Sequence, residues 1–209
     1  MKKGILGFFF IGLLSFPISS WALFEARLSY GSLASKQSLS DICQGSCGNP
    51  NNAPAIVPTF GMGADAIVTL PFIPFGFGLR TEDMKLSAEA NGIGAEIKYN
   101  RTAVLVNYRL IDTIVHFGPI ASFGIAHSGS AKLSENGISV VEISPEKTSS
   151  YSVGLELLVK PLVVIPITVG AEAGYMNYKW GQTTNTIDSS QKEVDLSGSY
   201  LKVCLGLDF

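Results

Sequence analysis

The chain ends in Tyr200-Leu-Lys-Val-Cys-Leu-Gly-Leu-Asp-Phe209, a stretch in which apolar residues occupy every second position. In an extended strand successive side chains point to opposite faces. One face of this strand therefore carries Leu201, Val203, Leu205, Leu207 and Phe209. The other face carries polar and small residues that include Lys202, Gly206 and Asp208. Strict alternation of this kind predicts a β-strand with one apolar face and one polar face.

The same alternation recurs along most of the chain, whereas a sustained helical period is almost absent. At the start, Phe24, Ala26, Leu28 and Tyr30 alternate with polar residues. Further alternating segments span 56–70, 73–80, 101–110, 114–128, 151–160 and 167–180. Together with the C-terminal segment they predict eight strands and an all-β fold.

The connections between these segments fall into two length classes. Strands meet across short turns at 71–74, 112–113 and 161–166. The other four connections, at about 32–55, 81–100, 129–150 and 181–195, are long and rich in Ser, Asn, Gly and charge. Short turns at one end and long loops at the other are typical of eight-stranded antiparallel transmembrane β-barrels, with periplasmic turns and extracellular loops. Both termini are then expected on the periplasmic side.

Composition supports a protein that avoids water. Of 209 residues, 46% are apolar and only 15% are charged, against roughly 25% charged in ordinary soluble domains. The net charge of −2 is too close to neutral for a nucleic-acid binder, whose domain is usually basic. The chain is also too apolar to be disordered.

The N-terminal residues 1–22 are predicted to be a cleaved signal peptide, which leaves 23–209 as one barrel domain. Lys2 and Lys3 precede an apolar run that ends at Pro17, and Ala22 offers a small residue for cleavage. A membrane anchor is the alternative, but the apolar run is shorter than the ~20 residues of a spanning helix. Leu23 follows the proposed cut. Because this residue is not cysteine, a lipoprotein is disfavoured.

Three cysteines fit export to an oxidising compartment. Cys43 and Cys47 lie in a glycine-containing loop, and a local disulfide between them is expected ahead of free thiols or metal binding. No neighbouring histidine or cysteine completes a zinc set. Cys204 lies in a strand and is expected to be a small buried residue.

If the apolar face of each strand meets lipid, ten charged side chains point into the barrel. They are Glu25, Arg27, Asp65, Arg80, Arg101, Arg109, Glu156, Glu172, Lys202 and Asp208. Five are acidic and five are basic, and buried charges require partners. The balance predicts a charge-plugged lumen, for which inward glycines leave room, and it disfavours an open pore. Lys160, near a short turn, is expected at the membrane interface.

Two other folds compete with the barrel. A soluble β-sandwich also alternates apolar and polar faces, but it needs no balance of sign on its polar face. A membrane helix over 113–131 is long enough to consider, because this stretch has no formal charge. Gly118-Pro119 and the alternation around it favour a strand instead.

The leader, the eight-strand layout and the ending Leu201-x-Val203-x-Leu205-x-Leu207-Asp208-Phe209 together resemble the small eight-stranded outer-membrane barrels. These include the OmpX/Ail-like and OmpW-like surface proteins and the barrel domain of OmpA. The resemblance implies that the ending is a signal for the barrel-assembly machinery. It departs from the usual pattern at Leu207, where an aromatic residue is common.

Some barrels of this class modify lipid A, and the dipeptide His127-Ser128 raises the possibility of a lipid A deacylase-like hydrolase. The deacylase pattern is His-x-Ser-Asn, which this chain lacks. Adjacent strand residues also face opposite sides. His127 is therefore expected at the rim, at headgroup level, and His116 is expected to be a hydrogen-bonded lumen residue. No catalytic residue, metal site or cofactor is predicted.

Two non-enzymatic roles remain. A structural or surface-recognition protein would use its four outer loops to contact an extracellular ligand or host surface. An OmpW-like channel would pass small apolar molecules, and apolar residues inside the upper barrel would favour it. Expected partners are outer-membrane lipid, lipopolysaccharide and the assembly machinery, with no nucleic acid.

Overall fold

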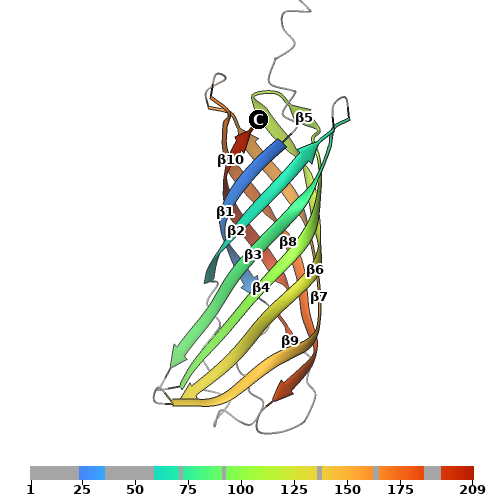
Figure 1. Cartoon of the computed structure of the whole chain (residues 1–209). Helices are drawn as coiled ribbons and strands as arrows, with labels where there is room; N and C mark the ends of the chain where they lie inside the picture. Colours follow the sequence, from blue (N-terminus) through green and yellow to red (C-terminus); the bar gives the residue numbers. More distant parts are fainter. Residues whose placement is uncertain are drawn as a thin grey trace, which may run out of the picture.

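Eight long strands form the molecule in the computed structural model, which describes residues 24–35, 59–70, 73–90, 93–135, 138–161, 165–185 and 194–209 (Figure 1). The long strands are β1 (Phe24–Ser35), β2 (Thr59–Thr69), β3 (Phe75–Ala90), β4 (Ile93–Tyr108), β6 (Val115–Glu135), β7 (Ile138–Val159), β8 (Ile167–Asn185) and β10 (Gly198–Asp208). Two short strands, β5 (Ile111–Asp112) and β9 (Val194–Asp195), pair with β6 and β8.

The sheet closes on itself. Each long strand pairs antiparallel with its neighbour, and β10 pairs with both β8 and β1. The predicted eight-stranded antiparallel barrel is therefore confirmed. Closure excludes the β-sandwich, and β6 covers the stretch for which a helix was considered. Within the described ranges, no helix is long and apolar enough to cross a membrane.

Side chains point alternately to the outside and the inside of the barrel, as the alternation in the sequence predicts. On β10 exposed and buried residues alternate without a break. The apolar residues of the expected assembly signal, Leu201, Val203, Leu205, Leu207 and Phe209, all point outward. The barrel thus has apolar side chains outside and polar ones inside, the reverse of a soluble domain.

The two ends of the described chain lie together at the end of the barrel that carries the short connections (Figure 1). The Phe209 N–H donates to the Phe24 carbonyl at 2.8 Å, and the two rings stack with centroids 6.4 Å apart. The last residue therefore joins the final strand to the first and completes the closed wall.

Two of the connections predicted as long loops are mostly strand, so those predictions were wrong. Residues 81–90 continue β3 and residues 93–100 begin β4. Likewise 129–135 continue β6 and 138–150 begin β7. The outward side chains become polar there, at Asp83 and Lys85 for example, because this part of the barrel extends beyond the apolar belt. Polarity alone was mistaken for a loop signal.

One ladder of the barrel is interrupted. Strands β6 and β7 pair from Val115↔Val159 to Phe123↔Tyr151, and pairing resumes in the same register at Ala131↔Ile143. Between these points neither strand is paired with the other, although β6 still pairs with β4 and β7 with β8. We call this interval, 124–130 of β6 and 144–150 of β7, the β6–β7 seam.

Residues 1–22 and the cysteines Cys43 and Cys47 lie outside the described residues. The signal peptide and the disulfide therefore stay predictions.

Candidate functional site

The barrel interior is the candidate site, and all ten charged residues assigned to it by parity are buried there. Glu82 and Lys160 are buried with them. Among the described residues this gives six acidic and six basic side chains inside the barrel, so the balance of sign is kept.

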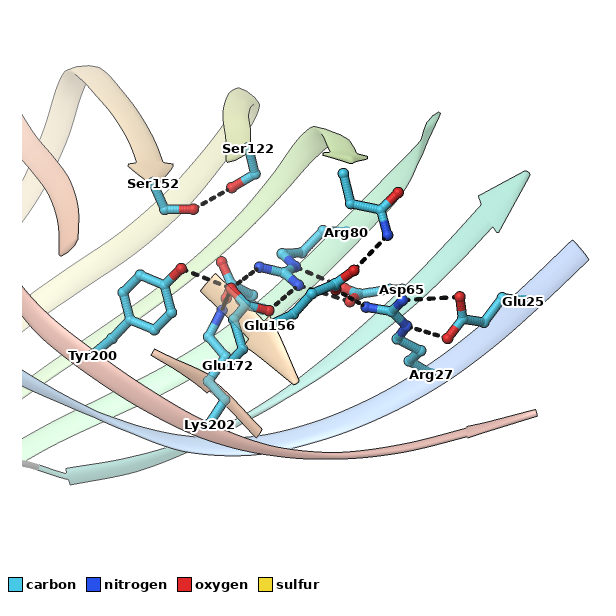
Figure 2. Close-up of polar contacts among 12 residues, drawn as sticks. Glu25, Arg27, Asp65, Arg80, Ser122, Ser152, Glu156, Glu172, Tyr200 and Lys202 are labelled. Carbon is cyan, nitrogen blue, oxygen red and sulfur yellow. Dashed lines mark hydrogen bonds and ion pairs between the residues drawn. The ribbon is translucent and has the colours of Figure 1, made fainter. Parts of the chain in front are cut away.

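The middle of the lumen is crossed by two arginines. Arg80 on β3 binds Asp65 on the neighbouring strand through Nε and Nη2, both at 2.8 Å. It also reaches Glu172 on β8, at 2.8 and 2.6 Å. Arg27 in turn bridges Glu25 and Glu156 (Figure 2). Each guanidinium thus holds two carboxylates from different parts of the wall, the geometry in which arginine binds most specifically.

The end with the termini carries a second set of ion pairs. Arg109 binds Glu25 at 2.5 Å, and the Lys160 ammonium lies 2.7 Å from a carboxylate oxygen of Asp208. Lys160 was expected at the membrane interface; it is instead buried, because it follows the end of β7 with its side chain turned inward and Asp208 neutralises it. His116 is buried with its Nε2 3.1 Å from Asp112.

Toward the end of the barrel opposite the termini, which we call the outer end, Glu82 is the carboxylate that sequence reasoning placed in a loop. It pairs with Lys202 and, at 2.7 Å, with Nε of Arg101. Arg101 also donates to the Ser122 hydroxyl, which lies 2.6 Å from that of Ser152 (Figure 2). These side chains form the last charged layer of the lumen.

Glycines make room for this network at specific positions. Gly154 and Gly174 face each other across β7 and β8, and a Cβ on either would approach the Tyr200 hydroxyl within 3 Å, at 2.5 and 2.9 Å. That hydroxyl donates to Glu172 at 2.7 Å. The two glycines therefore create the space that lets Tyr200 reach the central ion pairs.

Above the charged layer the lumen becomes aromatic and apolar. Its buried side chains include Leu33, Met84, Ile97, Tyr99, Met176, Tyr178, Trp180 and Leu196. The Tyr99 and Tyr178 rings lie 4.5 Å apart. Sequence reasoning missed this layer in part because Leu33, Met84, Ile97 and Tyr99 lie in stretches predicted as loops. Met176, Tyr178 and Trp180 lie in a predicted strand, and the inward alternation that they share with Glu172 was the available signal.

His127 does not lie at the outer rim as expected. A β-bulge at Ile125 shifts the register against β4 between Thr102 and Ala103 and turns the following residues over. The His127 Nε2 now lies 2.8 Å from the Ser150 hydroxyl, and its ring packs edge-on against Tyr178. Ser128 is exposed on the opposite face, so the dipeptide does not form a catalytic pair.

Outside the barrel, lysines follow the apolar belt at its outer edge. Lys85 and Lys98 face each other on β3 and β4, and both contact Glu96, Lys98 at 2.8 Å. Hydrogen bonds from Lys85, which has the larger effect, and from Lys98 lower the pKa of Glu96. Lys132, Lys147 and Lys179 occupy outward positions on β6, β7 and β8. We call these five lysines the lysine rim.

Other kinds of chemistry have little support in the described residues. No group of three or more His, Cys, Asp or Glu side chains there could hold a metal ion. Cys204 is a free, buried cysteine, as its strand position predicts. Every buried carboxylate described above has a cationic partner, so the network is built for mutual neutralisation.

No protein-family model and no curated protein matches this chain. Among solved structures, a major outer membrane protein from Thermus thermophilus aligns with a TM-score of 0.56 at 11% identity, over 89% of this chain and 99% of that one. Neisserial surface protein A aligns with a TM-score of 0.49 at 11% identity, and Ail of Yersinia pestis with 0.46 at 14%; each covers 89% of this chain and 96% of the other. The likeness to the Thermus protein shows a shared barrel fold.

Proposed function

We propose that the chain is an integral outer-membrane barrel whose lumen is closed to ions and whose role is structural or lies in recognition at its outer end. The observation that carries this is the reversed polarity of the wall. Large apolar residues such as Phe77, Leu155 and Leu205 are about half exposed, at 47, 53 and 53%. Water would penalise that surface, whereas lipid accepts it.

The closed lumen follows from the paired charges. Eight strands enclose a space that side chains can fill. Arg80 and Arg27 span it, and each is neutralised by two carboxylates. A continuous water column would need this network to break, which would leave buried ions without partners at several kcal/mol each.

The test is reconstitution of the full chain in planar bilayers. We expect heat-modifiable migration on gels, which marks a folded barrel, together with no stable conductance. A variant with Arg27→Ala, Arg80→Ala, Glu156→Ala and Glu172→Ala removes the two arginines that span the lumen together with their partners across the barrel, and serves as the positive comparison. A reproducible large pore from the unmodified protein would refute the closed lumen, and recovery as a soluble product would refute the membrane location.

The proposed partners follow from the lysine rim, the C-terminus and the outer end. The lysine rim lies where the phosphates of lipopolysaccharide would stand, and ammonium groups bind phosphate by charge and hydrogen bonding. The outward face that ends at Phe209 supports recognition by the barrel-assembly machinery. An extracellular ligand or host surface would meet the connections at the outer end.

A second candidate is a binding site or route for small apolar molecules, and the aromatic upper lumen favours it. Tyr99, Tyr178 and Trp180 are buried inside the barrel beyond the last charged layer. Aromatic and thioether side chains in such a position suit an apolar guest better than an ion. A lipid A deacylase-like hydrolase has less support, because His127 and Ser128 face opposite sides of the wall.

A further inference from the structure

We propose that the β6–β7 seam is a lateral port through which a small neutral aromatic molecule passes between the upper lumen and the outer edge of the membrane. The inference rests on the second candidate function. Its first support is the interrupted ladder: seven described residues on each strand lack pairing across the seam, although the register on both sides of the interval is the same. An opening can therefore close by simple re-pairing, without a slip of either strand.

Both strands carry irregularities that face away from the seam. On β6 the bulge at Ile125 breaks the register with β4, and on β7 the register with β8 shifts at Pro145–Lys147 and Lys147–Thr148. Proline has no N–H to donate to a ladder. A bulge bends its strand locally, while β6 stays paired with β4 and β7 with β8 on either side of these shifts.

Small side chains border part of the seam, beside the larger exposed Ile125 and Lys147. Ser128 is exposed on β6 and Ser149 on β7, while His127 and Ser150 point inward and meet across the gap at 2.8 Å. A Cβ at Gly124 would lie 2.2 Å from the Ser150 oxygen and 2.3 Å from His127 Nε2. Glycine at 124 is what lets this one contact form, and the contact acts as a latch in place of the missing backbone pairs.

The aromatic layer lies directly behind the latch. The ring of His127 is 5.8 Å from that of Tyr178. A Cβ at Gly129 would come within 3.1 Å of the Trp180 ring, so the seam backbone and the indole are already in contact. A guest that passes the latch therefore meets aromatic faces first, which sets its chemistry as flat, apolar and uncharged.

The position of the seam along the barrel axis determines which regions it would connect. It begins just beyond Phe123 and Tyr151, which are 56 and 44% exposed and form the last outward pair before the ladder breaks. Below it, Glu82, Arg101 and Lys202 close the lumen to an apolar guest. A molecule that enters from the outer end is thus blocked below, and the seam offers it a sideways exit at the edge of the lipid.

The experiment measures contact between a bilayer-dissolved quencher and Trp180. The full chain carries Trp21→Phe, so that Trp180 is its one tryptophan, and Cys43→Ser with Cys47→Ser. Gly124→Cys and Ser150→Cys, which the register of Phe123↔Tyr151 places opposite each other at the start of the seam, are added to lock the latch by oxidation. Nitrobenzene in the vesicle bilayer is the quencher, and iodide in the water reports access through the outer end. We expect oxidation to lower nitrobenzene quenching several-fold, to leave iodide quenching unchanged, and to be reversed by reductant.

The matched control places the cross-link at Ala121→Cys and Val153→Cys, a paired position of the same two strands just below the seam. Oxidation there should leave nitrobenzene quenching unchanged. Equal quenching in the locked and unlocked latch would overturn the port, as would quenching that falls equally in both cross-linked pairs. Heat-modifiable migration is recorded for every sample. If heat-modifiable migration persists while oxidation of the latch cysteines leaves nitrobenzene quenching unchanged, the port is refuted and the proposed membrane barrel stands.

Discussion

Arg80 and Glu172 meet across the barrel, on strands that share no ladder. Arg80 lies on β3 and Glu172 on β8, with β10, β1 and β2 between them along the wall. Their side chains form two parallel contacts of 2.8 and 2.6 Å, and Asp65 accepts hydrogen bonds along the Nε–Nη2 edge of the guanidinium. This pair ties opposite sides of the wall together, which neighbouring-strand hydrogen bonds do not.

Replacing Arg80 by Met should destabilise the barrel strongly, because it leaves Asp65 and Glu172 buried without their shared cation. Removal of one partner of a buried pair costs about 3–5 kcal/mol. Adding Glu172→Gln to the same variant should recover part of the loss, since one buried charge fewer is left without its cation. Urea unfolding in lipid vesicles, followed by gel mobility, measures both. A double variant as unstable as the sum of the two single variants would contradict the pairing.

Gly174→Val should disturb the centre of the lumen. A Cβ there would lie 2.2 Å from the Val153 carbonyl oxygen and 2.6 Å from Gly154 Cα, so the strands must shift. We expect a loss of about 1–3 kcal/mol, the usual cost of overpacking. The temperature of the gel-mobility transition is the measurement. Ala173→Val adds similar bulk at an exposed outward position and should leave that temperature almost unchanged.

The sequence was sufficient for the barrel because lipid and lumen impose opposite polarities on alternate residues. On β10, Val203 and Leu205 point outward and Lys202 points inward, as the alternation predicts. Parity also placed each of the ten charges inside. It could not show which acid meets which base, because Arg80 and Glu172 are 92 residues apart in sequence.

The alternation of apolar and polar residues gave wrong predictions in two places: beyond the apolar belt, and after a bulge in the backbone. Glu82 and Tyr99 were not assigned to the lumen, because polar outward side chains beyond the apolar belt resemble the sequence of a loop. The inward residues there still occur at every second position. His127 was expected at the rim, whereas one extra residue, Ile125, reverses the positions that follow it in β6 and turns His127 inward. A glycine inside a strand, such as Gly124, is a weak sign of a bulge. The spacing of apolar residues does not show how a strand is aligned with its neighbour, so it could not locate this bulge.

The lysine rim yields a prediction about lipid. Lys85→Gln with Lys98→Gln should weaken binding to lipopolysaccharide vesicles, because two phosphate-binding cations are lost while size and polarity are kept. Glu96→Gln should strengthen it, since Lys85 and Lys98 would no longer be neutralised by the carboxylate between them. Co-sedimentation against phosphate-free vesicles measures the difference. Identical binding by the unmodified protein and both variants would contradict a role for this part of the rim.

The cysteine spacing gives a prediction that covalent labelling can settle. We expect Cys43 and Cys47 to be bridged, so that alkylation without reductant leaves the mass of the loop peptide unchanged. Cys204 is buried and should react only after unfolding. Labelling of both loop cysteines in the folded, unreduced protein would contradict the disulfide, whereas labelling after reduction serves as the control.

Amide hydrogen exchange should distinguish the seam from the rest of the same two strands. In an antiparallel pair, alternate residues bond to alternate neighbours, so about half of the amides in 124–130 and 144–150 lose their partner at the seam. These amides should exchange much faster than those of 115–123 and 151–159, which pair across the β6–β7 ladder. Oxidising the Gly124→Cys, Ser150→Cys variant should slow them, because a covalent latch limits local opening. Equal protection along the whole of β6 would mean that the wall is continuous there, and the lateral port would lose its structural basis.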